Sequence, residues 1–522
     1  MVRRIAQKIE DFCLYRSNSS IFKFLDVFYR PFIFFGGFVS FRLTGCLHRY
    51  ATVAIIGILC MLSLLIGSLF GEQEFSRLIS TSDHPLIDFV PNFFFLLFPM
   101  KVGDLLIFIG QLLLLSIFLF TAFFIVYLKK AKTFFSLPVL SWFILIALGS
   151  LTALSSQNMA VMGFGFLLFD VGVFLLIARS KSFKSEFEST IKFIVLNLLG
   201  SALFFMGCAL IFWKTNTLFM SDMGLFFSSE ALSPKGALLS LGLILVLSGV
   251  ATKLGAIPFH MWIPDLFEGE MVLTSFLILF SSSAMYFLVF LKLFLSDLSR
   301  ADQILYPFIL LVSSSSILLG IFLSYVQKSL KRLLAYFFIA HLGYVLFALS
   351  LVHKASLGGH AFFWLIAHLL FSLGTLSFLM WLEGEKRIDP NLDAIRGLVE
   401  KNPLICGLFS LVLLSFSGFP STIGFSARWF LIAQLIKQNT YFPIFLMIMG
   451  SLLSLFISLS IMLRIYGSKH IDHSTQKIYP EIEPKKDRFF SYILIGTVLM
   501  IFLFGTVFAQ PMLTILNNCS VG

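Results

Sequence analysis

The chain has 522 residues, of which 58% are hydrophobic and only 12% are charged, and its mean hydropathy is +0.95. This composition excludes a soluble globular protein and predicts a polytopic membrane protein. The formal net charge of +11 reflects 38 basic and 27 acidic residues. Most of the basic residues fall in loops on one predicted side of the membrane, so the charge indicates orientation and gives no reason to invoke nucleic acid.

Apolar segments long enough to cross a hydrocarbon core of ~30 Å recur from Ala51 onward. They predict an all-α polytopic membrane protein with about 13 transmembrane helices. The predicted spans are 51–70, 104–128, 134–155, 157–178, 190–213, 236–257, 271–296, 304–326, 333–352, 358–382, 402–432, 441–466 and 489–514. Their mostly short connections make successive helices antiparallel neighbours, with the N-terminus on the basic, untranslocated side.

The segment before these spans, residues 1–50, interleaves basic residues with Phe, Tyr and Leu. It is not a cleavable signal peptide, because its one apolar stretch is short, late in the segment and flanked by arginines. Two interpretations stay open: a basic amphipathic arm on the membrane surface or against a partner subunit, and a disordered basic tail.

Two predicted spans are interrupted. KLGAIPFHMWIPDLFEGE, residues 253–270, places Pro258 and Pro264 after the intramembrane Lys253, and each proline removes a backbone donor. In residues 413–435, Gly418, Pro420 and Gly424 precede the intramembrane Arg428. Irregular backbone at membrane depth is tolerated only where it meets protein, water or a cavity.

Two broken helices, each with one cation and five spans apart, are typical of inverted-repeat transporters. The sequence therefore predicts two peripheral helices over 51–133, a first five-helix repeat over 134–300 and a second over 301–466. Residues 467–522 follow as a polar loop and a C-terminal transmembrane helix.

Charged side chains inside a membrane are costly and therefore point to function. Burial favours the neutral amine of Lys253, which brings proton exchange within reach at neutral pH. Asp170 is the carboxylate within the fourth span, and because an unpaired buried carboxylate is costly, we expect it to pair with Lys253. Lys292 is close enough to Arg300 along the chain that its side chain is expected to reach the surface. Lys331 and Arg332 are predicted to be interfacial anchors.

Three histidines, His341, His360 and His368, fall in or beside spans nine and ten. A buried histidine is more often a hydrogen-bonded core residue, but histidines between a lysine and an arginine also suit a proton relay with water. Both interpretations stay open for His341 and His368, whereas the position of His360 near a helix end favours the relay less.

Three segments carry a joint signal: KLGAIPFHMWIPDLFEG, QKSLKRLLAYFFIAHLGYVLF and RGLVEKNPLICGLFSLVLLSFSGFPSTIGFSARWFLI. Together they resemble the antiporter-like membrane subunits of respiratory complex I, above all the subunit N type, which is called subunit 2 in mitochondria. The similarity extends over roughly residues 134–514. The resemblance implies a proton-translocating subunit of NADH:ubiquinone oxidoreductase, with Lys253 as the central proton-exchanging lysine and His341 as a second family position.

The chain departs from the family pattern at three positions. Asp170 stands for a glutamate after a two-residue gap, Ser283 stands where a lysine is expected, and Arg428 replaces the lysine of the second broken helix. A guanidinium does not deprotonate in proteins, so Arg428 is expected to act as a fixed charge while protons pass through His368, Ser283 or water.

The resemblance further implies that this chain carries no redox cofactor and no metal, while NADH, FMN, iron–sulfur clusters and ubiquinone belong to partner subunits. The six cysteines, which form no CxxC motif, agree with this expectation. The implied partners are other complex I membrane-arm subunits and lipids such as cardiolipin, without nucleic acid.

Two other functions remain open, a cation/proton antiporter subunit and a mainly structural subunit with a degraded relay. The 66 phenylalanines suggest an AT-rich organellar genome. With the N-terminal arm, they favour the mitochondrial inner membrane over a bacterial plasma membrane or a plastid membrane.

Overall fold

The structure is a computed structural model that describes residues 137–178, 184–230, 237–270, 272–295, 301–350, 358–383, 392, 395–467, 488–510 and 513. The chain divides into two compact units, Met1–Leu96 and Leu97–Gly522, and every described residue belongs to the second. The predicted N-terminal arm and the predicted spans 51–70 and 104–128 lie outside the described residues.

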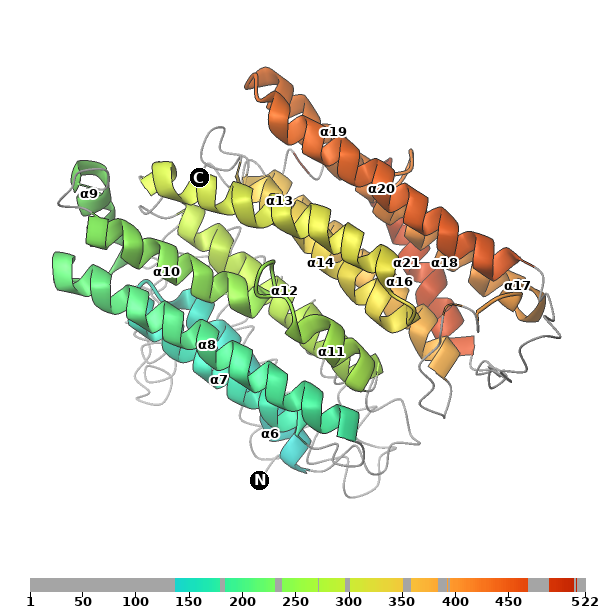
Figure 1. The fold of residues 1–522 in the computed structure, drawn as a ribbon, viewed down its shortest axis with the longest axis horizontal. Helices are drawn as coiled ribbons and strands as arrows, with labels where there is room; N and C mark the ends of the chain where they lie inside the picture. The colour runs from blue at the N-terminus through green and yellow to red at the C-terminus, as the bar shows by residue number, and fades with distance from the viewer. Residues whose placement is uncertain are drawn as a thin grey trace, which may run out of the picture. The chain divides into compact units, whose positions relative to one another are not determined.

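The elements of the described part are α-helices, labelled as in Figure 1. Their bounds are α6 Leu137–Ser155, α7 Met159–Ile177, α8 Lys184–Thr215, α9 Met220–Glu230, α10 Ala237–Leu254, α11 Trp262–Gly269, α12 Val272–Leu295, α13 Asp302–Val326, α14 Leu330–Leu349, α16 Gly358–Glu383, α17 Leu398–Lys401, α18 Pro403–Ser417, α19 Ile423–Lys437, α20 Tyr441–Tyr466 and α21 Arg488–Gly505. Among the described residues, eight helices are long and apolar enough to cross a membrane. The predicted fold class, a polytopic all-α membrane protein with discontinuous helices, is confirmed.

The helices follow the predicted spans from 134–155 onward, with differences at the two breaks. The predicted span 236–257 ends as α10 and is followed by the short helix α11, and the predicted span 402–432 is divided into α18 and α19. The short helix α9 was not predicted. The boundaries of the two repeats stay a prediction.

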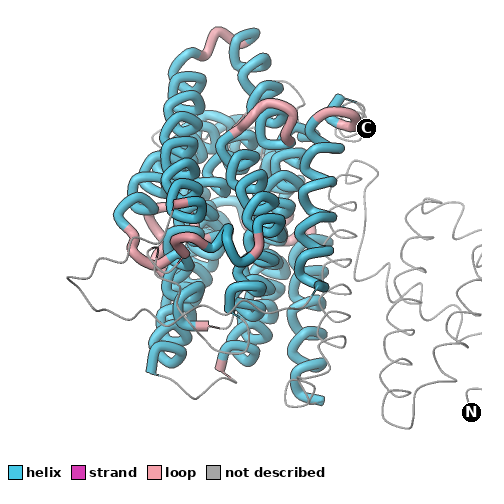
Figure 2. Tube along the Cα trace, turned by 90° about the vertical axis from the view of Figure 1, so that its right-hand side faces the viewer, coloured by secondary structure: helices cyan, strands magenta, loops and turns pink. Residues whose placement is uncertain are grey.

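The described helices run alongside one another, as Figure 2 shows. In chain order, α6 packs on α7, α8 on α10 and α13 on α14, and α16 contacts α12, α14, α18, α19 and α21. The helices α12 and α14 lie in the interior, because 94% of the residues in the most apolar part of each helix are buried. Polar side chains on these two helices are therefore held away from lipid.

The contact between α8 and α10, which lie side by side in Figure 1, is made by glycines. A methyl group at Gly207 would lie 2.5 Å from the carbonyl oxygen of Gly242, and one at Gly249 would lie 2.6 Å from that of Gly200. Small residues at such positions let helix backbones approach closely in membranes. This seam fixes α10, which carries Lys253, against α8.

The first helix break follows α10. Gly255 has a φ of +78°, which suits glycine, and its amide donates to the carbonyl of Ala251 at 3.0 Å. Pro258 lies in the linker after a cis peptide bond with Ile257. The prediction for Pro264 was wrong, because this residue lies in the first turn of α11. A proline there removes an amide that has no partner within the helix, so it does not interrupt it.

The second break separates α18 from α19. Gly418 ends α18 with a φ of +83°, and Pro420 lies in the linker before Ile423. Gly424, predicted to interrupt the helix, is instead part of α19. A methyl group there would lie 1.9 Å from the carbonyl oxygen of Ser415, so this glycine serves the close packing of α19 on the end of α18.

Candidate proton-translocation site

Lys253 and Asp170 form an ion pair inside the bundle. The ammonium lies on the last turn of α10 and is 0% exposed, and the carboxylate projects from the middle of α7. Lys253 Nζ donates to Asp170 Oδ2 and, at 3.2 Å, to the carbonyl oxygen of Asn197 on α8. The predicted contact between the two charges is therefore present, two residues before the helix break.

Three neighbours of this pair were missed by the sequence reasoning. The hydroxyl of Tyr286, on α12, donates to Asp170 Oδ1 at 3.0 Å. The rings of Tyr286 and Phe166 lie with their centroids 5.8 Å from Lys253 Nζ. Tyr286 follows Ser283 by about one helical turn, so both lie on one side of α12. The polar residues of this segment could therefore have indicated Tyr286 as a candidate site residue. The Asn197 carbonyl is a backbone group and left no trace in the sequence.

The prediction that Lys292 reaches the surface was wrong. Its side chain on α12 is buried, and Nζ donates to the carbonyl oxygens of Leu154 at 2.5 Å and Ser156 at 2.7 Å, at the end of α6. A cation is favourable at a helix C-terminus, where carbonyls lack partners within the helix. Lys331, predicted to be an interfacial anchor, is also buried, because it lies on the central helix α14.

His341 and His368 meet in the interior. The Nδ1 atoms of His341 on α14 and His368 on α16 are 3.2 Å apart, a distance at which one ring donates to the other. Phe371 stacks on His341 with an interplanar angle of 8°. The contact fits both a proton relay and a hydrogen-bonded core pair, so the relay stays a prediction. His360 is buried near the start of α16.

Arg428 is buried on α19 and 4% exposed. Its Nη2 donates to the carbonyl oxygen of Phe416 at 2.5 Å, and its guanidinium carbon lies 4.7 Å from the centroid of the Tyr344 ring and 5.9 Å from that of Trp364. Among the described residues, no carboxylate forms an ion pair with it. Aromatic faces thus supply the negative potential around this cation.

Ser283 is buried in α12, and its hydroxyl donates to the carbonyl oxygen of Phe280 at 3.1 Å on the same helix. The structure therefore brings together Asp170 with Lys253 and His341 with His368, while Ser283 joins neither pair by a described hydrogen bond. This arrangement places two separate buried pairs of titratable side chains in the bundle.

Comparison with known proteins identifies related chains. A family model described as NADH:quinone oxidoreductase/Mrp antiporter, TM matches residues 156–454. NADH-quinone oxidoreductase subunit N of Ectopseudomonas mendocina is 30% identical over 382 residues, which cover 72% of this chain and 75% of that protein. The subunit N of Shewanella woodyi is also 30% identical, over 58% of this chain and 65% of its own length.

Two solved assemblies contain chains with a similar fold. A chain of respiratory complex I from Thermus thermophilus superposes with a TM-score of 0.61 at 22% identity, covering 79% of this chain and 85% of that chain. A chain of the Mrp complex from Dietzia sp. also gives a TM-score of 0.61, at 16% identity, covering 73% of this chain and 77% of that chain. At these identities the likeness concerns the fold alone.

Proposed function

The chain belongs to the NADH:quinone oxidoreductase/Mrp antiporter transmembrane family, and from this premise we propose that it is a proton-translocating membrane-arm subunit of NADH:ubiquinone oxidoreductase, complex I. The observation that carries the proposal is the buried pair of Lys253 and Asp170 beside a helix break. A lysine enclosed by one carboxylate, one carbonyl and aromatic rings is suited to holding a proton and giving it up.

The proposed step is a change in the ion pair. A conformational or electrostatic change, linked to quinone reduction in partner subunits, alters the contact between Asp170 and Lys253. A stronger contact keeps Lys253 charged, and a weaker contact favours release of its proton. The break at Gly255 gives the end of α10 a place to move without bending the helix itself.

Beyond the pair, we assign the histidines and Arg428 to the second half of the path. The close contact of His341 with His368 allows a proton to pass between two rings. Arg428 stays charged and biases the protonation of its neighbours, and Ser283 or water completes the path. These roles rest on burial, contact and family membership.

No redox chemistry is assigned to this chain. The proposed partners are the other membrane-arm subunits, with NADH, FMN, iron–sulfur clusters and ubiquinone bound by partner subunits, and membrane lipids such as cardiolipin. The compared relatives are bacterial and therefore give no support to a mitochondrial inner membrane, which rests on the phenylalanine content and the N-terminal arm alone. Fractionation of the source cells tests this location.

A cation/proton antiporter subunit is the second candidate function. It is favoured by the breadth of the matching family and by the fold shared with the Mrp complex chain. The subunit N relatives, at up to 30% identity, favour complex I. A mass-spectrometric inventory of what co-purifies with the chain in mild detergent separates the two, because complex I contains hydrophilic NADH-oxidising subunits and an antiporter complex does not.

The direct test replaces the lysine. In membrane vesicles containing the assembled complex, Lys253→Ala is expected to abolish most proton pumping, whereas Lys214→Ala, at an exposed lysine on α8, leaves it unchanged. Pumping at the wild-type rate in the Lys253→Ala complex contradicts the proposal. A normal proton-to-electron ratio after replacement of both Lys253 and Asp170 favours the mainly structural alternative.

A further inference from the structure

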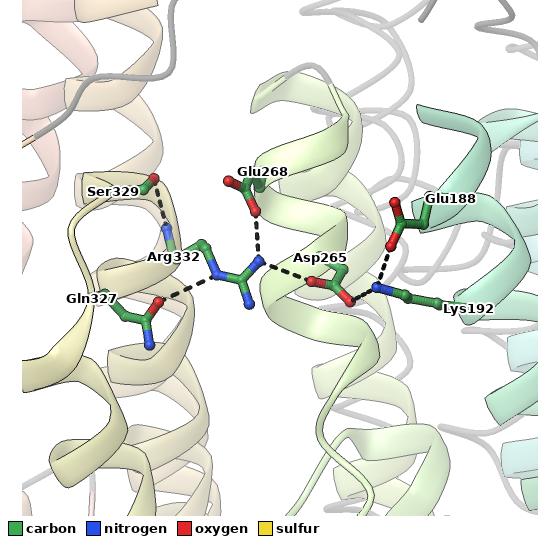
Figure 3. Close-up of polar contacts among 7 residues, drawn as sticks. All are labelled: Glu188, Lys192, Asp265, Glu268, Gln327, Ser329 and Arg332. Carbon is green, nitrogen blue, oxygen red and sulfur yellow. Dashed lines mark hydrogen bonds and ion pairs between the residues drawn. The ribbon is translucent and has the colours of Figure 1, made fainter. Parts of the chain in front are cut away.

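A second group of charges surrounds α11, the short helix after the first break. Asp265 Oδ2 accepts from Lys192 Nζ on α8 at 2.8 Å, and Asp265 Oδ1 accepts from Arg332 Nη1 on α14 at 3.0 Å (Figure 3). Arg332 Nη1 also contacts Glu268 Oε2 at 2.6 Å. One carboxylate on α11 thus binds a cation on each of the two helices that flank it.

The two contacts of Asp265 are partly shielded from solvent. The side chains of Asp265 and Arg332 are 18% and 30% exposed, and that of Lys192 is 42% exposed, so the contact with Arg332 is the better shielded of the two. Glu188, which contacts Lys192 at 2.7 Å, is 67% exposed. The Nε of Arg332 donates to Gln327 at 3.3 Å, and Ser329 caps the start of α14 through the Arg332 amide. These two contacts fix the orientation of Arg332 toward α11. The prediction that Arg332 is an interfacial anchor therefore leaves out its contacts with α11.

The helix that carries Asp265 depends on its neighbours for its position. With eight residues, α11 is too short to be stable alone. Its apolar side is buried between α8 and α14, where Ile263 and Leu266 are 0% exposed. On its polar side, Asp265 is the residue that contacts both flanking helices.

A hydrogen bond connects α11 to the residue next to Lys253. The indole Nε1 of Trp262, the first residue of α11, donates to the carbonyl oxygen of Thr252 at 3.1 Å. Trp262 is buried, and its ring contacts Phe193 on α8 at a centroid distance of 5.4 Å. A displacement of α11 therefore acts on the last turn of α10, where Lys253 faces Asp170.

We propose that Asp265 is a positioning residue for the Lys253–Asp170 pair: its contacts with Lys192 and Arg332 hold α11 between α8 and α14 and thereby fix the turn that carries Lys253. The inference rests on the proposed function. A membrane-surface anchor is a weaker explanation, because an anchor needs no contact with two helices on opposite sides.

The test compares isosteric variants in vesicles containing the whole complex. Asp265→Asn removes both ion pairs, and the proton-pumping rate divided by the NADH oxidation rate is expected to fall about fivefold, because two partly exposed pairs together contribute about 1 kcal/mol. Asp265→Glu restores the carboxylate and is expected to recover most of the ratio. The matched control Glu268→Gln removes one contact of Arg332 while both pairs of Asp265 remain, so its ratio stays within about twofold of wild type.

The outcomes separate the inference from the proposed function. If Asp265→Asn and Glu268→Gln give the same ratio in assembled complex, the inference is overturned. If Asp265→Asn does not assemble, Lys192→Gln and Arg332→Gln each remove one side, and wild-type ratios in both also overturn it. Lys253→Ala is measured in parallel. If Lys253→Ala loses pumping and Asp265→Asn does not, the inference alone has failed. If Lys253→Ala pumps normally, the proposed function has failed.

Discussion

Replacement of Asp170 by asparagine removes the counter-charge of Lys253 and keeps the size of the side chain. Two unit charges about 4 Å apart attract each other by about 4 kcal/mol at an effective dielectric constant of about 20. The Tyr286 hydroxyl, which donates to Asp170 Oδ1, keeps an acceptor in the amide oxygen. Most of the loss is therefore electrostatic, and it matches the about 3–5 kcal/mol typical of breaking a buried ion pair.

We expect Asp170→Asn to lower proton pumping per complex at least tenfold, because about 1.4 kcal/mol already corresponds to that factor. The assay measures acidification of vesicles with a pH-sensitive dye and NADH oxidation with an ionophore, both normalised to assembled complex on native gels. Asp222→Asn, at an exposed aspartate on α9, is the matched control. Pumping at the wild-type rate in assembled Asp170→Asn complex refutes the reasoning.

A double variant separates stability from transport. Replacing a buried ion pair by apolar residues of similar size is often neutral for stability, whereas removing one partner is not. Asp170→Leu with Lys253→Met is therefore expected to assemble better than either single variant and still not pump. Pumping by this double variant shows that protons do not pass through the pair.

Three further outcomes are expected. Gly418→Ala places a side chain at a φ of +83° and against the guanidinium of Arg428, so it lowers the thermal unfolding temperature in detergent; Gly496→Ala, with nothing within 4 Å, does not. Lys292→Met leaves the Leu154 and Ser156 carbonyls without this donor and costs about 2–3 kcal/mol in denaturant unfolding, against no change for exposed Lys437→Met. Arg428→Lys keeps the positive charge and retains pumping in vesicles, whereas Arg428→Gln loses it; equal pumping in both contradicts a role for the charge.

The spans were predictable because membrane helices are long apolar segments with few charges. Asp170 was found by elimination, since it is the one carboxylate in its span and a buried lysine needs a partner. The helix end at Gly418 was predictable because it depends on the backbone conformation of this one glycine.

The misses have physical causes too. Lys292 was placed at the surface from its distance to Arg300 along the chain, but α12 lies in the middle of the bundle, and packing decides burial. Pro264 was read as a break because the sequence does not show where the first turn of α11 begins. The Asn197 carbonyl and the link from Trp262 to Thr252 depend on three-dimensional contacts.

The glycine seam between α8 and α10 has a bioenergetic consequence. A water molecule needs about 10–15 Å³ of free volume, and backbones close enough to exclude a methyl group leave none at these positions. No chain of water molecules can therefore run through these close contacts, so the seam acts as electrical insulation there, on the side of α10 that faces α8.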